Sequence, residues 1–161
     1  MSSTTHSYRP TDLPDASEMR FGIVVAEWNQ HITGTLLEGA LRILRQAGAG
    51  EHAVTVMHVP GSFELIYGAA ELARHGLVDA IITIGCVIRG DTPHFDYICQ
   101  GVTQEIARQN TEGKIPVIFG LLTTNTEQQA LDRAGGTLGN KGEEFAATAI
   151  KMVDYAWQLQ K

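Results

Sequence analysis

Four short runs of apolar residues recur along the chain, and segments with a mixed polar pattern separate them. The runs span residues 21–26, 53–59, 80–85 and 116–122, and each is rich in β-branched residues. Apolar residues in these runs are nearly continuous rather than alternating, which is typical of strands buried on both faces of a parallel sheet. The pattern therefore predicts four strands of one buried sheet.

The segments between and after these runs have the spacing of amphipathic helices. Residues 63–75 predict one such helix, which ends at Gly76. Thr126 with Gln129 and Asn140 with Glu143 have the spacing of helix-capping pairs, so two helices are expected after the fourth strand. The remaining apolar stripes are Leu37, Leu41 and Leu44 before Gly48; Phe95, Ile98, Cys99, Val102 and Ile106; and Phe145, Ala149, Ile150, Val153 and Trp157.

The predicted order of elements is β-α-β-α-β-α-β-α-α. Repeated βα units favour a parallel sheet with helices on both faces, and right-handed crossovers favour a doubly wound arrangement. We therefore predict a three-layer, flavodoxin-like α/β fold with four main strands. Residues 1–19, rich in Ser, Thr, Asp and Pro, predict a loose N-terminal arm, and residues 20–161 a single domain.

Composition narrows the function classes. A net charge of −6 and a pI near 5.4 argue against non-specific nucleic-acid binding. The polar N-terminus has no signal-peptide pattern, and no apolar run approaches the ~20 residues of a membrane span. The two cysteines and six histidines show no metal-ligand spacing. These features predict a cytoplasmic protein without a metal site.

In a doubly wound sheet, ligands bind outside the carboxyl ends of the strands. Trp28, after the first strand, could stack on a flat heterocycle or simply pack. Ser62, after the second strand, is expected to begin a helix, and Glu64 would stabilise the first turn or bind ligand hydroxyls.

The segment after the third strand is the most informative. Gly90 allows an unusual turn, and Thr92 followed by Pro93 fits the start of a helix, whose N–H groups can bind an anion. His94 would lie in the first turn beside that anion. Histidine titrates near neutrality, so His94 is either an acid–base group or a surface histidine. Asp91 should contribute only its backbone N–H, because its carboxylate would repel an anion.

After the fourth strand, Arg133 closes the short predicted helix, where it would clamp phosphate or interact with the helix dipole. Lys141 opposes the dipole of the last helix, which hints at a role beyond structure. No Walker loop, dinucleotide fingerprint or hydrolase elbow is present.

Together, these strand-end residues resemble the lumazine synthase family of riboflavin biosynthesis. The likeness covers roughly residues 21–157, and its motifs occur in order. They are Ala-Glu-Trp-Asn at 26–29, Val-Pro-Gly-Ser-Phe-Glu at 59–64, Gly-Cys-Val-Ile-Arg-Gly-Asp-Thr-Pro-His-Phe-Asp-Tyr at 85–97, Val-Ile-Phe-Gly-Leu-Leu-Thr-Thr at 117–124, Asp-Arg-Ala-Gly at 132–135 and Gly-Asn-Lys-Gly at 139–142.

The resemblance implies a transferase that condenses 5-amino-6-(D-ribitylamino)uracil with 3,4-dihydroxy-2-butanone 4-phosphate. The products would be 6,7-dimethyl-8-ribityllumazine, phosphate and water, with no metal or organic cofactor. His94 matches the proton-transfer residue. The matched substrate-binding residues are Trp28, Asn29, Ser62, Phe63 and Glu64 for the pyrimidine and ribityl chain, Val87 and Ile88 for the heterocycle, Gly90, Asp91, Thr92 and Arg133 for the phosphate, and Phe119 and Lys141 over the ring.

The resemblance also implies a homo-oligomer, because the family forms pentamers and some members form icosahedral shells of twelve pentamers. Phe119, Arg133 and Lys141 match the side of the site that a neighbouring subunit donates. The short connection at residues 134–142 is similar to that of shell-forming members. Riboflavin synthase is a further candidate partner.

Three other functions compete with this interpretation. A non-catalytic member of the same fold would bind riboflavin or form a shell, but His94 and Arg133 are both retained. A flavodoxin-like electron carrier needs a phosphate loop after the first strand, which residues 27–30 do not supply. A signalling receiver needs an Asp at the end of the third strand, where Gly85 and Cys86 stand.

Overall fold

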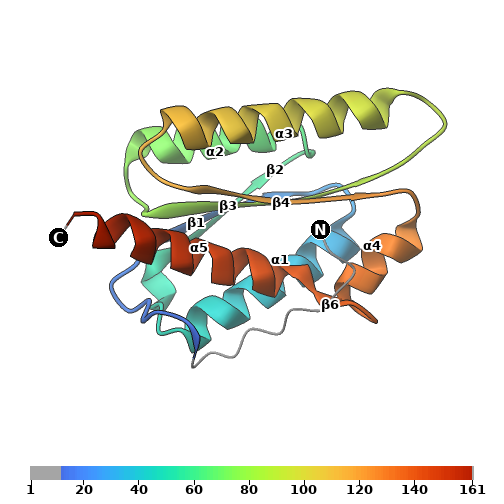
Figure 1. The fold of residues 1–161 in the computed structure, drawn as a ribbon. Helices are drawn as coiled ribbons and strands as arrows, with labels where there is room; N and C mark the ends of the chain where they lie inside the picture. Colours follow the sequence, from blue (N-terminus) through green and yellow to red (C-terminus); the bar gives the residue numbers. More distant parts are fainter. Residues whose placement is uncertain (1–11, 161) are drawn as a thin grey trace.

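The computed structural model describes residues 12–160, and a four-stranded parallel sheet lies at its centre (Figure 1). The strand order is β2-β1-β3-β4, so β1 and β3 occupy the middle of the sheet. The strands are β1 (Phe21–Ala26), β2 (Val54–Val59), β3 (Ala80–Ile88) and β4 (Val117–Thr124).

Helices cover both faces of this sheet, which confirms the predicted three-layer α/β fold (Figure 1). One face carries α1 (Gln30–Gln46), α4 (Glu127–Arg133) and α5 (Lys141–Gln158), and the other carries α2 (Leu65–His75) and α3 (His94–Glu112). A 3₁₀ turn, Glu51–Ala53, precedes β2. A small antiparallel pair, β5 (Ala134–Gly136) and β6 (Gly139–Asn140), joins α4 to α5.

The strand β3 is three residues longer than predicted, because residues 86–88 continue to pair with β4 as far as Thr124. The helices at this edge start later than predicted. Helix α2 begins at Leu65 rather than near Ser62, and α3 begins at His94. The prediction that Thr92 caps α3 is wrong: the Pro93 carbonyl receives the first N–H groups, from Asp96 and Tyr97.

Buried apolar residues form one cluster on each side of the sheet, and the predicted arm contributes to one of them. Ala16 and Met19 are almost completely buried, and the Ala16 N–H donates a 2.8 Å hydrogen bond to the Ala47 carbonyl. Residues 12–19 therefore pack on the domain and are not a loose arm. The rest of the predicted arm, residues 1–11, lies outside the described residues.

The two capping pairs differ in how far they follow the prediction. The Gln129 N–H donates to Thr126 Oγ1, as expected, while Gln129 Oε1 accepts from the N–H of Asn125. Asn140 accepts a bond from the Gly142 N–H and donates to the Thr35 carbonyl, which ties α5 to α1. Glu143, however, pairs with Arg42 and does not complete a capping box. Within the described chain, no helix has the length and hydropathy to span a membrane.

Candidate active site

A cavity of about 460 Å³ opens at the carboxyl ends of β1 and β3. Its lining comes from four chain segments: the turn after β1, the turn after β2, the end of β3 and the start of α3. Most of the residues predicted to bind substrate meet there. The lining residues are Trp28, Asn29, Ser62, Phe63, Glu64, Cys86, Val87, Ile88, His94 and Ile98.

The Trp28 side chain presents one face of its indole to solvent at the cavity. It is 65% exposed, although a hydrophobic residue of this size is normally buried. The other side of the ring lies against Gly61, where an added Cβ would approach the ring to 2.8 Å, and the backbone N–H of Trp28 donates to the Pro60 carbonyl. The turn after β2 thus supports the indole from behind and leaves a flat apolar surface open to the cavity.

Ser62, Phe63 and Glu64 contribute polar and aromatic groups from the turn before α2. The Ser62 side chain is buried, whereas Phe63 is half exposed and leans toward Gly101 of α3. Neither the Ser62 hydroxyl nor the Glu64 carboxylate bonds to another residue that the structure describes. Both groups are therefore available to hydroxyl or amide groups of a ligand.

Residues 90–92 connect β3 to α3 at the rim of this cavity. All three are exposed, and none of them forms a hydrogen bond with the described part of the chain. His94 follows as the first residue of α3, and its exposed imidazole likewise has no partner among the described residues. The segment therefore presents free N–H groups and a free imidazole side by side, next to the positive end of the helix dipole.

Cys86 lies in the same cavity but lacks nucleophilic character. It is 3% exposed, and burial, reinforced by the charge of Glu127, raises its pKa to about 12. A thiol with this pKa stays protonated at neutral pH, and the thiolate is the reactive form. Cys86 therefore acts as an apolar wall of the cavity.

The remaining predicted residues lie away from this cavity. Phe119, 38% exposed on β4, borders a separate open hollow beside α3. Arg133 ends α4 and donates to the Gln129 carbonyl, 2.8 Å away. Lys141 is 1% exposed and pairs with Glu144 at 2.5 Å, which offsets its unfavourable place at a helix start. A single chain therefore does not bring these three side chains to the others.

The chain is similar to one known protein family over most of its length. The family model described as 6,7-dimethyl-8-ribityllumazine synthase matches residues 18–156. The chain belongs to this family. Proteins of that name from Phocaeicola vulgatus and Bacteroides fragilis are each 62% identical to it, over 96% and 89% of this chain and 92% and 100% of theirs. A third, from Parabacteroides distasonis, is 58% identical over 92% of this chain and 93% of its own.

Membership in the lumazine synthase family confirms the prediction of a transferase of riboflavin biosynthesis. Membership in the family also agrees with the prediction of a homo-oligomer, because proteins of this family are typically homo-oligomers. The matched region contains all the predicted site residues, from Trp28 to Lys141.

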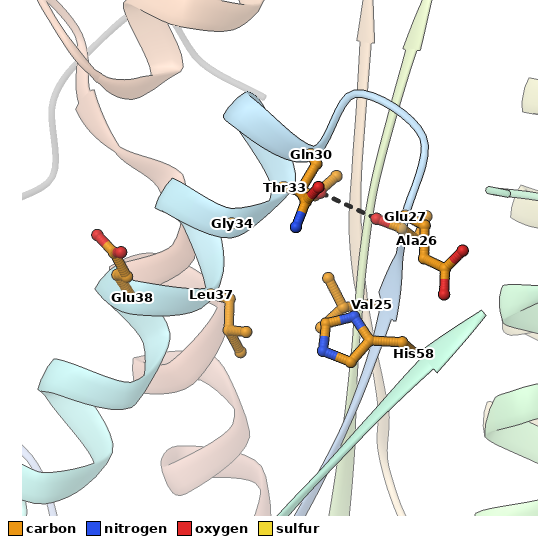
Figure 2. A pocket seen from close by; sticks show the side chains of 9 residues that line it. All are labelled: Val25, Ala26, Glu27, Gln30, Thr33, Gly34, Leu37, Glu38 and His58. Atoms are coloured by element: carbon orange, nitrogen blue, oxygen red, sulfur yellow. Dashed lines mark hydrogen bonds between the residues drawn. The ribbon is translucent and has the colours of Figure 1, made fainter. Parts of the chain in front are cut away.

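The structure contains a second cavity, of about 500 Å³, that the sequence did not predict (Figure 2). It lies between α1 and the strands β1 and β2, and a hydrogen bond from Thr33 Oγ1 to the Ala26 carbonyl crosses one side of it. His58 and Glu27 border it, but no group of three or more His, Cys, Asp or Glu suited to a metal occurs among the described residues. The sequence did not predict this cavity because the small, apolar and polar residues that line it do not form a recognisable motif.

Proposed function

We propose that this chain condenses 5-amino-6-(D-ribitylamino)uracil with 3,4-dihydroxy-2-butanone 4-phosphate, giving 6,7-dimethyl-8-ribityllumazine, phosphate and water. One observation carries the proposal. A single cavity joins the open face of Trp28, the unpaired Glu64 carboxylate and the free imidazole of His94, next to the unbonded N–H groups of residues 90–92. These are the groups that a flat heterocycle, a polyol chain and a phosphate require.

The pyrimidine half of the reaction would occupy the β1 and β2 side of the cavity. Trp28 would stack on the ring, and backbone groups of Val87 and Ile88 would contact its edge. Asn29, Ser62, Phe63 and Glu64 would hold the ring and the ribityl hydroxyls. Ser62 and Glu64 suit this task because hydroxyl and carboxylate oxygens accept hydrogen bonds from a polyol.

The phosphate half would lie at the start of α3. The N–H groups of Gly90, Asp91 and Thr92, together with the helix dipole, would hold the phosphate. His94 would then remove and return protons while the amine attacks the ketone, water leaves to give the imine, phosphate is eliminated, and the second amine attacks the remaining carbonyl and closes the ring with loss of a second water. All of these steps transfer protons and pairs of electrons, so the proposal needs no metal or organic cofactor.

The site would be completed by a neighbouring subunit. Phe119, Arg133 and Lys141 stay outside the cavity in the single chain, although their motifs match the side that a neighbour donates. Arg133 still has guanidinium donors beyond the one used on Gln129, and a planar fork suits phosphate. Lys141 enters the proposal on its motif, because its side chain is buried against Glu144.

We further propose that the oligomer is a pentamer in the cytoplasm and that twelve pentamers form a 60-subunit shell. The short β5–β6 connection between α4 and α5 supports the shell, because it leaves little bulk where subunits would meet. Riboflavin synthase, which would consume the lumazine product, is the proposed protein partner.

The decisive experiment mixes the purified protein with both substrates and follows lumazine fluorescence and phosphate release above the uncatalysed background. Catalysed formation of both products in equal amounts is expected. Background rates from folded, oligomeric protein would overturn the proposal. A titration with riboflavin would then test a non-catalytic flavin-binding or shell role.

A further inference from the structure

The guanidinium of Arg89 joins three parts of the chain around the proposed phosphate loop. Its Nη1 and Nη2 donate to the two carboxylate oxygens of Asp96, at 3.2 and 2.8 Å. Its Nε donates to Asn125 Oδ1 at 3.2 Å, just beyond β4. Its Cζ also lies 4.1 Å from the centre of the Phe95 ring. Arg89 therefore connects the first turn of α3 to the residue that follows β4.

The segment that Arg89 encloses has few other restraints. The Arg89 N–H donates to the Thr124 carbonyl at 2.9 Å, which fixes the chain as it leaves β3. Residues 90–92 then make no hydrogen bond within the described part of the chain until α3 begins. Because the side chain of Arg89 returns to Asp96, it closes a loop around this segment.

His94 depends on the same restraint. Its two successors in α3, Phe95 and Asp96, are the residues that the guanidinium stacks on and binds. The imidazole itself has no hydrogen-bond partner among the described residues. A small rotation of the first turn of α3 would therefore move His94 relative to the cavity wall at Ile88 and Trp28.

We propose that Arg89 is a positioning residue that holds His94 in place for the lumazine-forming reaction, through its bidentate contact with Asp96 in the same helical turn. This inference rests on the proposed role of His94. The pair stays ionised near neutrality, since the hydrogen bonds from Arg89 hold the pKa of Asp96 below its usual value. Lysine could supply the charge but not the planar fork or the stacking on Phe95.

The test compares Arg89→Ala, Arg89→Lys and Asp96→Asn with the matched control Arg108→Ala. Arg108 lies on α3, as Asp96 does, and its guanidinium pairs with the carboxylates of Glu105 and Glu112. We expect Arg89→Ala and Asp96→Asn to lower kcat on the order of 10- to 100-fold, because small misplacements of a reacting group are costly. Arg89→Lys should be intermediate, and Arg108→Ala should match the parent.

Measurements of the melting temperature and of KM distinguish a positioning role of Arg89 from a role in stability or in phosphate binding. Arg89 and Asp96 are both substantially exposed, so their pair should affect the melting temperature little. The KM for the butanone phosphate should stay nearly constant while kcat falls. If Arg89→Ala raised this KM and left kcat unchanged, Arg89 would be a phosphate ligand and the inference would be overturned. Should Arg89→Ala fail to fold, Asp96→Asn carries the same expectation with less change in shape.

The last experiment introduces Arg89→Ala into a His94→Ala background and measures kcat again. If Arg89 acts through His94, its effect should shrink to about twofold or less there, as coupled residues do in a double-mutant cycle. An undiminished effect would overturn the inference. A His94→Ala enzyme with full activity would instead overturn the proposed role of His94, and the inference with it. A crippled His94→Ala together with an unaffected Arg89→Ala would overturn the inference alone.

Discussion

The side-chain amide of Asn29 donates a 3.0 Å hydrogen bond to the carbonyl oxygen of Cys86, which connects the ends of β1 and β3 across the floor of the cavity. Asn29 is also the one non-glycine residue with a positive φ in the described chain, at φ 60° and ψ 42°. Asparagine tolerates this left-handed conformation better than most residues. Asn29 thus begins α1 and also ties the turn that carries Trp28 to the end of β3, where Val87 lies.

Replacing Asn29 should separate its two contributions. Asn29→Gly removes only the hydrogen bond and adds flexibility, and should lower the free energy of unfolding by about 1 kcal/mol. Asn29→Ala also places a Cβ in the left-handed region, so a total loss of about 2–3 kcal/mol is expected. Urea unfolding at one fixed protein concentration measures both. Equal losses in the two variants would show that the backbone conformation is not strained by a Cβ.

His94→Ala should cripple the enzyme without abolishing its activity. Loss of general acid–base catalysis should lower kcat by about 10²–10⁴-fold, while the gain from holding both substrates together remains. Steady-state kinetics by lumazine fluorescence measure this, with the uncatalysed rate subtracted. The control is binding of the pyrimidine substrate, which should persist. Complete loss of turnover in a folded variant that binds substrate would contradict the expectation.

Much of the fold could be predicted because the strands are buried on both faces. Continuous apolar runs such as that ending at Ala26 can hardly form anything else between helical segments, so the sheet and its helices followed from the periodicity. Element ends were less predictable. Strand β3 runs on to Ile88 because its last residues find backbone partners on β4, and local sequence does not record such partners.

The N-terminal segment and the site also show that contacts between distant residues are hard to predict from sequence. The sequence predicts a loose arm that includes Ala16 and Met19, because nothing in a short polar segment reveals that two of its apolar side chains belong to the core. The cavity residues, in contrast, could be predicted because each follows a strand end. The contacts of Arg89 with Asp96 and Asn125 could not be, since they depend on the direction of a long side chain.

The pH dependence of stability should reveal the buried thiol of Cys86. Its pKa is raised from 9.0 to about 12 in the folded chain. The unfolded chain therefore loses this proton first as pH rises, so the stabilising contribution is complete below pH 9 and declines above it. Between about pH 9 and 11, wild-type stability should fall more steeply than that of Cys86→Ala. Denaturant unfolding of the wild type and Cys86→Ala at several pH values measures the slopes, and parallel curves would refute the assignment.

Two glycines should respond in opposite ways to alanine. A Cβ on Gly142 would collide with the Leu36 carbonyl oxygen, a backbone atom, where α5 crosses α1. Gly142→Ala should cost about 3 kcal/mol or more, or prevent assembly. Gly34, inside α1, has nothing within 4 Å of the same position, so Gly34→Ala should stabilise the helix by about 0.5–1 kcal/mol. Thermal unfolding compares the two, and a tolerated Gly142→Ala would mean that the crossing is looser than described.

A site shared between subunits makes a prediction that no single-chain site can match. Arg133 ends α4 and does not line the cavity that contains His94. If a neighbour donates Arg133, a mixed oligomer of impaired His94→Ala and Arg133→Ala subunits contains some interfaces where both residues are intact. With equal amounts and random exchange, about one quarter of the sites should be restored.

The measurement unfolds and refolds the two variants together and compares their lumazine synthesis with that of each variant refolded alone. The matched control mixes His94→Ala with the double variant His94→Ala/Arg133→Ala, in which no site can contain both residues. We expect recovery only in the first mixture, because only there can a His94 from one subunit meet an Arg133 from the next. Mass spectrometry of the assemblies establishes that exchange has occurred. If exchange is complete and activity stays at the level of the separate variants, Arg133 does not reach a neighbour's cavity, and the proposal of a shared site is overturned.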